Sequence, residues 1–542
     1  MIHFAIRHRS LRCVLTCLST LRALLATDDA WLVSHNPFGP VLMRLRMFLP
    51  QSSLSWLLLG AHAWIALCAA GCTNKAAEPS QAGAAPAVAG TAVAVAAAPE
   101  DPEQAREAAL IAADFPLHGL VTGSQLKVRD AADPTALVLG WLRVGSRVRL
   151  AKQPTKTATC SSGFYKVYPR GFACAGEGIE VGDAPPQSDL AVTAPAKDAP
   201  LPYRYFLVKE PKVPEFHRLP SRDDQRAARD FLDRYIALAA KNADKAEKFM
   251  RGELPNEPPS PAVVRRYLDR GYFVAGAAVE ERASRQFVRT VRGTYIKQTQ
   301  LEERNGSSFR GVELDATHTL PVAWAVREAA AFSAKTREDG SLRFVTDPES
   351  PVYPRRSILP WVGRERVGGE ILHKLSDGRY LKHWFAAVAE KIARPKGVKA
   401  DEPWVHVNID QQTLVLYRGD APVYATLVSS GMEGHDTPLG LFDIRAKYVA
   451  STMSDIGPDA GDDRYSIEDV PWTEFFSGSI ALHGAFWHDG FGLRRSHGCV
   501  NLAPYDAHRV FNHTWPTVSA GWHGVSTDKT GTKASKVYIT AE

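Results

Sequence analysis

One short segment of the chain gathers the residue types that nucleophilic catalysis needs. Three histidines, His483, His488 and His497, lie within 16 positions of Cys499. The thiolate is the reactive form of cysteine, and a neighbouring imidazole can lower the thiol pKa or accept its proton. The backbone amides of His497, Gly498 and Cys499 could stabilise an oxyanion, because preorganised donors stabilise developing negative charge. The pattern therefore indicates acyl transfer through a cysteine nucleophile.

Two other interpretations use the same residues. Histidine and cysteine are zinc ligands, but His497 and Cys499 are only two positions apart, and the segment has no second cysteine. A buried free cysteine beside structural histidines is the non-functional alternative, which the Ser-His-Gly-Cys context disfavours. We therefore expect no metal site.

The same residues carry a family resemblance. Ser496-His-Gly-Cys-Val-Asn501, preceded by His483-Gly484, resembles the signature of the L,D-transpeptidase (YkuD-type) catalytic domain. Further similarity lies at Gly431, Thr437-Pro438, Gly440 and Ile467-Glu-Asp-Val-Pro-Trp472. The resemblance covers about residues 402–541. It implies a mainly β catalytic domain, a YkuD-like β-sandwich with short helices.

The resemblance also implies roles for individual residues. Cys499 is the nucleophile, His483 is the general base, and the backbone carbonyl of Gly484 orients that base. Twelve residues separate His483 from Ser496, slightly fewer than is usual, so His488 stays open as a competing base. The residues expected to shape the site and its oxyanion-binding part are Ser496, His497, Gly498 and Asn501.

Aromatic and basic residues near the motif are candidates for substrate binding. Tyr465, Phe486 and Trp487 are expected to wall the cleft, with simple packing as the alternative for each. Arg494 and Arg495 either meet a carboxylate of the substrate or are solvated loop charges, and we assign only Arg495 to the substrate.

The substrate that the resemblance implies is a peptidoglycan stem peptide. Cys499 attacks the L-centre carbonyl of the third residue of a tetrapeptide stem, D-alanine leaves, and an amine on a neighbouring stem resolves the thioester into a 3-3 cross-link. Water as the acceptor gives L,D-carboxypeptidase activity, and a protein amine gives protein-to-wall attachment. A carbapenem resembles the acyl donor and is expected to acylate the same thiol. The rival classes are a non-catalytic wall-binding lipoprotein and a cysteine peptidase.

The N-terminal part has the pattern of an export signal. A basic stretch at 43–46 is followed by an apolar run over 54–67 and by Ala-Ala-Gly before Cys72. These are the parts of a secretory signal, and they resemble a lipobox in which Cys72 is lipidated. An uncleaved transmembrane anchor is the alternative. Both place the rest of the chain outside the cytoplasm, in the cell envelope on the periplasmic face. Residues 1–42 precede the predicted signal (43–72) and are expected to be an untranslated or pre-signal segment.

The region between the signal and the catalytic domain is predicted to be modular. Residues 73–115 are rich in Ala and Pro and are expected to form a disordered tether. Short β-type runs over 116–184 predict a small β domain that weakly resembles SH3-like modules. A linker over 185–202 and an α+β region of unknown role over 203–401 follow.

Cysteine usage and charge add two further expectations. Cys160 and Cys174 lie close together in the small β domain, and outside the cytoplasm they are expected to form a disulfide rather than a metal site, because no partner ligands lie nearby. The chain of 542 residues has 65 Lys and Arg against 59 Asp and Glu, a net charge of +6 without a dense basic run. This excludes nucleic acid as an expected partner.

Overall fold

The structure is a computed structural model that describes residues 32–36, 39–43, 102–187, 192–346, 348–455, 464–527 and 529–541. The chain divides into two compact units, residues 1–96 and 97–542. In the first unit, β1 (Leu32–Asn36) and β2 (Gly39–Met43) form an antiparallel pair. The predicted lipidation site, Cys72, lies outside the described residues. No helix within the described ranges is long and apolar enough to cross a membrane.

The second unit begins with a helix in a segment predicted to be disordered. The tether prediction over 73–115 rested on the shortage of large apolar side chains, but residues Pro102–Asp114 form α3. Alanine and glutamate are strong helix formers, and a proline is well accommodated at the first helical position. The prediction is therefore wrong for this part of the segment.

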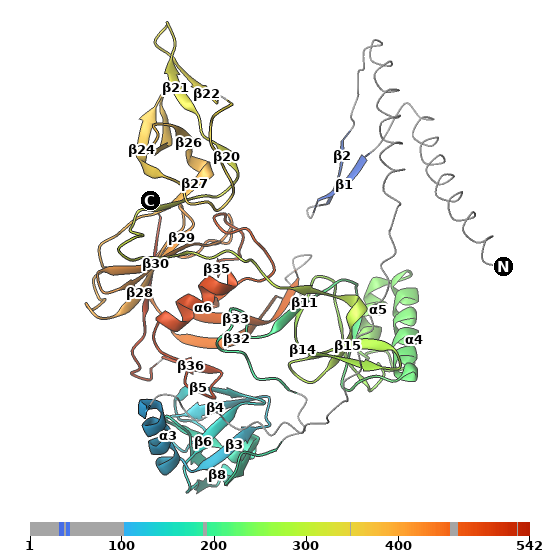
Figure 1. The fold of residues 1–542 in the computed structure, drawn as a ribbon. Helices are drawn as coiled ribbons and strands as arrows, with labels where there is room; N and C mark the ends of the chain where they lie inside the picture. Colours follow the sequence, from blue (N-terminus) through green and yellow to red (C-terminus); the bar gives the residue numbers. More distant parts are fainter. Residues whose placement is uncertain are drawn as a thin grey trace, which may run out of the picture. The chain divides into compact units, whose positions relative to one another are not determined.

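Three β modules follow along the chain (Figure 1). The first module, residues 117–182, contains β3 (Leu117–Val121), β4 (Gln125–Arg129), β5 (Val138–Arg143), β6 (Arg147–Leu150), β7 (Thr155–Thr157), β8 (Cys160–Lys166), β9 (Phe172–Cys174), η1 (Ala175–Glu177) and β10 (Ile179–Gly182). The second, residues 204–304, contains β11 (Arg204–Val208), β12 (Val213–Phe216), α4 (Arg222–Ala239), α5 (Ala243–Met250), β13 (Val264–Leu268), β14 (Phe273–Arg282), β15 (Arg285–Thr290), β16 (Tyr295–Lys297), η2 (Gln298–Gln300) and β17 (Leu301–Arg304). The third, residues 322–389, contains β19 (Val322–Ala325), β20 (Ala329–Ala330), β21 (Ser333–Thr336), β22 (Leu342–Val345), β23 (Val352–Tyr353), β24 (Trp361–Val367), β25 (Glu370–Leu375), β26 (Tyr380–Lys382), η3 (His383–Phe385) and β27 (Ala386–Ala389).

The sequence treated 203–401 as one α+β region, whereas the structure divides it into the second and third modules. Both of its α-helices belong to the second module, and Ser221 begins α4 with a capping box. The linker over 185–202 is attached to the catalytic domain. The Lys197 ammonium donates hydrogen bonds to the carbonyls of Ser519 and Trp522.

The three modules end in the same way. A hairpin turns at Gly171, Gly293 or Gly378, each with a positive φ of 80–89° that favours glycine. A short strand and one turn of 3₁₀ helix come next, and the last strand returns to pair with the first strand of its own module, as β10 with β3, β17 with β11 and β27 with β19. The modules are therefore an internal structural repeat, and the predicted likeness of the first module to SH3-like folds stays a prediction.

The catalytic domain is a sandwich of two β layers. One layer is the sheet of β18 (Val312–Glu313), β30 (Ala421–Leu427), β29 (Thr413–Arg418), β28 (Pro403–Asn408), β37 (Lys536–Thr540) and β31 (Gly440–Asp443). The other contains β32 (Ala446–Asp455), β33 (Tyr465–Ser477), β34 (Ile480–Gly484), β35 (Val500–Leu502) and β36 (Gly524–Ser526), and α6 (Pro504–His513) contacts it. Val405, Leu416, Val449, Leu482 and Val500 meet in the core between the layers.

The first layer is covered on its other face as well. Trp404 and Tyr417 pack in one buried cluster with Trp324 and Ala387 of the third module. This explains why β28 and β29 are buried along almost their whole length, since strands covered on both faces become nearly continuously apolar.

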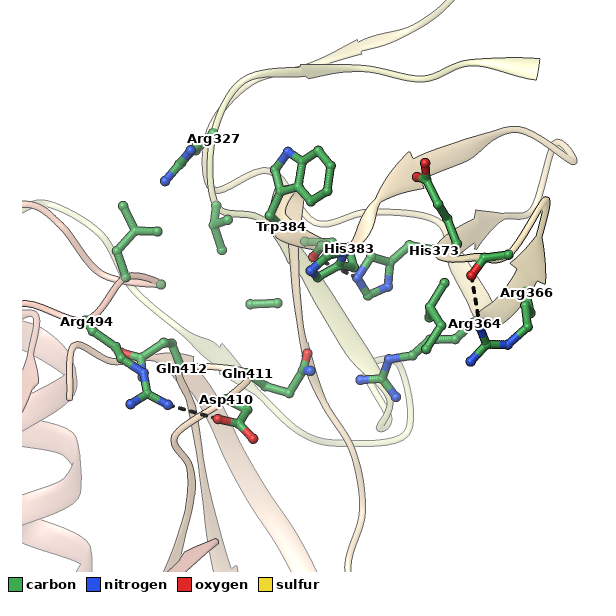
Figure 2. A pocket seen from close by; sticks show the side chains of 18 residues that line it. Arg327, Arg364, Arg366, His373, His383, Trp384, Asp410, Gln411, Gln412 and Arg494 are labelled. Carbon is green, nitrogen blue, oxygen red and sulfur yellow. Dashed lines mark hydrogen bonds and ion pairs between the residues drawn. The ribbon is translucent and has the colours of Figure 1, made fainter. Parts of the chain in front are cut away.

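The second layer is joined to the other two modules by strand pairing. β36 pairs with β5 of the first module, and β33 meets β14 of the second at Phe273 and Ile467. A cavity of about 720 Å³ lies between the third module and the catalytic domain (Figure 2).

Candidate active site

Two neighbouring strands place the predicted base beside the predicted nucleophile. β34 and β35 pair in parallel, with His483 opposite Asn501, and Cys499 directly precedes β35. Gly498 has a φ of 107°, which only glycine adopts without strain. The Thr437 hydroxyl donates to the Gly498 carbonyl at 2.8 Å. The Thr-Pro part of the motif thus fixes the backbone before the thiol.

Ser496 holds the same turn from within. Its hydroxyl accepts from the Gly498 amide at 3.1 Å and donates to the Cys499 carbonyl at 2.5 Å. The Gly498 amide is therefore occupied, which contradicts its predicted place among the oxyanion donors. The amides of His497 and Cys499 donate to no acceptor in the described part of the chain, so these two stay available for an oxyanion.

A cleft of about 650 Å³ opens at this turn. Most of the residues predicted for the site line it, namely Tyr465, His483, Trp487, Arg495, Ser496, His497, Cys499 and Asn501. Phe486 does not line the cleft. Its ring is stacked on Tyr205 of the second module, with the ring centroids 3.9 Å apart, so its alternative role in packing is the one that the structure supports.

His483 is oriented by the backbone. Its side chain is buried, and Nδ1 lies 3.3 Å from the Gly484 carbonyl oxygen. Because a carbonyl only accepts, Nδ1 carries the proton, and Nε2 is left as the accepting nitrogen. Burial lowers the pKa of His483 to about 4, although the Gly484 contact acts in the opposite direction. The imidazole is therefore neutral at physiological pH.

Cys499 is half-buried and has a free thiol. Burial raises the pKa of this thiol above its ordinary value of 9.0. Its Sγ points to the Ser479 carbonyl at 3.9 Å, and no hydrogen bond joins it to His483 among the described residues. The pair thus rests as a neutral thiol and a neutral imidazole rather than as an ion pair, so base-assisted attack is the mechanism that this arrangement allows.

His488, the competing base, is occupied at both ring nitrogens. Nδ1 accepts from the Gly490 amide at 3.1 Å, and Nε2 lies 2.9 Å from the Asn501 side-chain amide. A neutral imidazole has only one accepting nitrogen, so Asn501 must present Oδ1 to Nε2–H. That orientation also satisfies the buried Oδ1, which otherwise lacks a partner within the described residues. His488 positions Asn501, and this observation favours His483 as the base.

The two adjacent arginines point to different places. Arg495 lines the catalytic cleft. Arg494 forms an ion pair with Asp410 at 2.9 Å and lines the other cavity instead.

Sequence reasoning missed one wall of the cleft. Gly271 and Phe273 of the second module line it, as do residues 452–455 of β32. The Phe273 ring contacts Phe486 edge to face, with the centroids 5.5 Å apart. No motif marks these residues, since only the long-range contact of β14 with β33 brings Phe273 to the cleft.

A buried ionic cluster links the first and second modules to β33 of the catalytic domain. Arg143 of the first module pairs with Asp469, and Arg292 of the second module pairs with Asp469 and Glu468. Arg266 adds a contact to Glu468. Although burial alone would raise it, Arg143 and Arg292 hold the pKa of Asp469 below its ordinary value. Burial raises the pKa of Glu468 despite its arginine neighbours.

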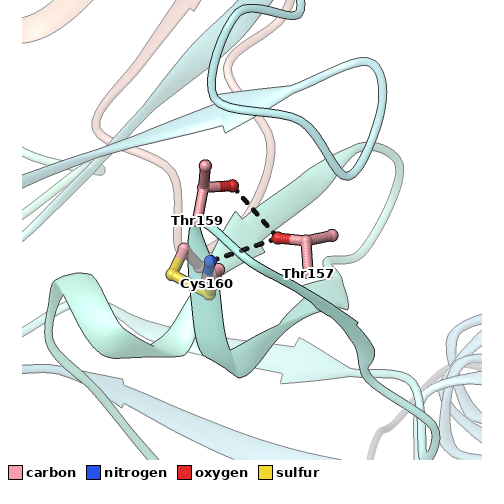
Figure 3. Close-up of a disulfide and its surroundings, with 4 residues drawn as sticks. Thr157, Thr159 and Cys160 are labelled. Carbon is pink, nitrogen blue, oxygen red and sulfur yellow. Dashed lines mark hydrogen bonds between the residues drawn. A yellow bond between two sulfur atoms is a disulfide. The ribbon is translucent and has the colours of Figure 1, made fainter.

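The predicted cysteine pair lies in the first module, away from the cleft. Cys160 and Cys174 are joined by a disulfide, with their Cα atoms 6.1 Å apart. The Cys160 amide donates to the Thr157 hydroxyl at 3.1 Å (Figure 3). Within the described residues, no group of acidic, histidine or cysteine side chains could hold a metal ion.

Comparison with known proteins assigns the C-terminal region. Residues 402–539 match the YkuD family, described as the L,D-transpeptidase catalytic domain. No curated protein matches the chain. The chain therefore carries an L,D-transpeptidase catalytic domain, and it is an enzyme of this kind.

Solved structures with similar parts include several L,D-transpeptidases. The LD transpeptidase LdtMt1 in complex with imipenem is 17% identical, with a TM-score of 0.22, over 34% of this chain and 78% of that one. An L,D-transpeptidase from Mycobacterium smegmatis is 18% identical, with a TM-score of 0.21, over 49% of this chain and 99% of that one. For an L,D-transpeptidase from Xylanimonas cellulosilytica the values are 19% and 0.18, over 27% of this chain and 64% of that one, which is less than two thirds of its length.

Proposed function

We propose that the chain is a peptidoglycan L,D-transpeptidase that forms 3-3 cross-links between stem peptides. The observation that carries this proposal is the placement of His483 and Cys499 on one cleft, with the accepting nitrogen of His483 left free by its Gly484 contact. The family match over 402–539 supplies the reaction class.

The reaction follows from the protonation states. His483 takes the thiol proton as the Cys499 sulfur attacks the carbonyl carbon of the third residue of a tetrapeptide stem. The free amides of His497 and Cys499 stabilise the oxyanion. The C–N bond then breaks, D-alanine leaves with the proton from His483, and a thioester remains. An acceptor amine then attacks the thioester and gives a proton to His483, the C–S bond breaks, and His483 returns the proton to the Cys499 sulfur. Neither metal nor organic cofactor takes part in this scheme.

The acceptor decides the product. An amine on a neighbouring stem gives the cross-link, water gives L,D-carboxypeptidase activity, and a protein amine attaches that protein to the wall. Because the substrate lies outside the cytoplasm, the proposal includes export to the cell envelope, with a lipid anchor at Cys72 and the catalytic domain on the periplasmic face.

Acylation by a carbapenem tests the nucleophile. The full-length chain incubated with imipenem is expected to gain one drug mass, and peptide mapping should place it on Cys499. In Cys499→Ala the gain should disappear while the melting temperature stays within about 2 °C, since the substitution truncates a small half-buried side chain. A folded parent chain that gains no mass at Cys499 would refute the proposed nucleophile.

A second assay identifies the acceptor. The parent chain with a disaccharide-tetrapeptide should release D-alanine and form a dimeric muropeptide. Release of D-alanine without a dimer would replace the transpeptidase with a carboxypeptidase, and binding without release in both the parent and Cys499→Ala would indicate a non-catalytic wall binder.

A further inference from the structure

The cavity between the third module and the catalytic domain is similar in size to the catalytic cleft, at about 720 Å³ against 650 Å³. Its walls come from β24, β25 and η3 on one side and from residues 410–412 and 492–494 on the other. Figure 2 shows Arg327 and Trp384 on one side of the space and Asp410 and Arg494 on the other. Because four arginines line it, we refer to it as the arginine cavity.

The charges of the arginine cavity are not balanced by its own acids. Arg364 pairs with Glu390 at 2.8 Å, and Arg494 pairs with Asp410 at 2.9 Å. Arg366 donates only to the Gly369 carbonyl. Arg327 is exposed and forms neither an ion pair nor a hydrogen bond with any described residue. Two guanidinium groups therefore have no carboxylate partner in the part of the chain that the structure describes.

The lining acids do not offset these two groups. Glu370 is held by Lys382, and Asp410 is held by Arg494. The planar guanidinium fork binds a carboxylate through two parallel hydrogen bonds, so Arg327 and Arg366 favour a carboxylate-bearing ligand.

An exposed tryptophan completes the wall. Trp384 is 48% exposed, and its ring contacts His383 and the Lys382 ammonium, which lies 5.6 Å from the ring centroid. A sugar ring presents an apolar C–H face that can pack on the indole, while the polar edge of Trp384 stays in water. Sugar stacking beside carboxylate binding is the combination that a peptidoglycan strand needs, since it carries both on one molecule.

The arginine cavity is also joined to the catalytic cleft through one loop. Arg494 lines the cavity, and the next residue, Arg495, lines the cleft. A strand held in the cavity would thus lie beside the loop that leads into the catalytic turn.

We propose that the arginine cavity binds a second peptidoglycan strand, with the stem-peptide carboxylates on Arg327 and Arg366 and a sugar ring on Trp384. The inference rests on the proposed function, because it takes the ligand class from it. It goes further in assigning the third module a wall-binding role that is separate from the chemistry.

Calorimetry with a soluble disaccharide-tetrapeptide tests the assignment. The full-length Cys499→Ala chain cannot turn the ligand over. It is expected to bind two equivalents, one in the catalytic cleft and one in the arginine cavity. Arg327→Gln/Arg366→Gln should weaken one site about tenfold, because two charge-assisted hydrogen-bonded contacts are lost. Trp384→Ala should weaken the same site by a similar factor. Arg229→Gln, which replaces an exposed arginine of α4 that does not line the arginine cavity, is the matched control and should change nothing.

Ligand variants give a readout that does not depend on the folding of the protein variants. A disaccharide-tetrapeptide with its carboxylates converted to amides should lose the affinity of the second site in Cys499→Ala. Inorganic phosphate should not displace the disaccharide-tetrapeptide from this site, and displacement would mean a general anion site and overturn the proposal.

Two outcomes separate this inference from the proposed function. Two equivalents bound with unchanged affinity in both cavity variants, or one equivalent in Cys499→Ala without a cavity substitution, would overturn the second strand site. Imipenem acylation of Arg327→Gln/Arg366→Gln with Cys499 intact should match that of the parent, so a failure of acylation there and in the parent would count against the nucleophile alone.

Discussion

The two walls of the catalytic cleft are built in different ways. One wall, called here the chemical wall, is a single stretch, 483–501, in which strand pairing and one turn place the proposed base, the thiol and the proposed oxyanion donors. The other wall, called here the docked wall, includes Phe273. This residue reaches the cleft only because the second module is docked on β33 through buried ion pairs. Bond-making chemistry needs a few atoms held within one turn, whereas the shape of the cleft depends on a module fastened at a distance. The first kind of information is local in the sequence and the second is dispersed.

Removing the base should have the largest effect and should act on the chemical wall alone. We expect His483→Gln to slow acylation by imipenem about a thousandfold, because the thiol loses its proton acceptor. Stopped-flow fluorescence or timed mass spectrometry measures the rate. His488→Gln is the matched control, and we expect a loss of only about tenfold, because this residue positions Asn501. Equal losses in the two variants would reopen the choice of base.

Loosening the docked wall should cost stability rather than chemistry. Asp469→Asn keeps the volume but leaves Arg143 and Arg292 without the charge that both contact. We expect the free energy of unfolding to fall by about 3 kcal/mol, as for other broken buried ion pairs. Urea unfolding followed by fluorescence measures it.

The matched control for this variant is Glu303→Gln, which removes the exposed pair with Arg204. That change should cost less than about 1 kcal/mol. A similar loss in both variants would mean that the buried cluster does not fasten the modules.

The sequence predicted that the residues of the chemical wall lie at one cleft, and the reason is local. Cys499, His483 and Ser496 lie in a motif whose glycines and hydroxyls hold their own backbone, so the local residues determine the local geometry. Phe486 was misassigned to the cleft because its direction is set by Tyr205, a partner from another module.

The modules were harder to anticipate for the same reason. The repeat over 204–304 and 322–389 leaves only a short trace in the sequence, because Gly293-Thr-Tyr-Ile-Lys297 and Gly378-Arg-Tyr-Leu-Lys382 match at the turn glycine, the tyrosine and the lysine. Its strands close on one another through pairings such as β17 with β11, which composition does not reveal. The family match likewise covers only 402–539, where the motif lies.

Acid should lower the free energy of unfolding of the whole assembly of modules and catalytic domain. Burial lowers the pKa of His483, His488 and His523 to about 4, while unfolding returns each to about 6.5. The unfolded chain therefore takes up protons first as the pH falls, and stability decreases between pH 6.5 and 4. We expect a loss of about 2 kcal/mol per histidine from pH 7 to pH 5.

Urea unfolding at the two pH values measures the loss. His523→Gln, placed at the junction with the first module, should show a smaller pH dependence than the parent. An unchanged dependence in that variant would show that the buried histidine does not contribute.

The smallest effect should come from trimming the docked wall. Phe273→Ala removes a ring that lines the cleft and contacts Phe486 and Trp487. We expect KM for D-alanine release from the disaccharide-tetrapeptide to rise about fivefold, since an aromatic contact contributes about 1 kcal/mol. The turnover number should hardly change, because the ring touches no atom that takes part in the proton transfer. Phe273→Leu, which keeps much of the apolar volume, should restore most of the KM. A fall in turnover without a change in KM would mean that the docked wall positions the chemical wall, and the division between them would no longer hold.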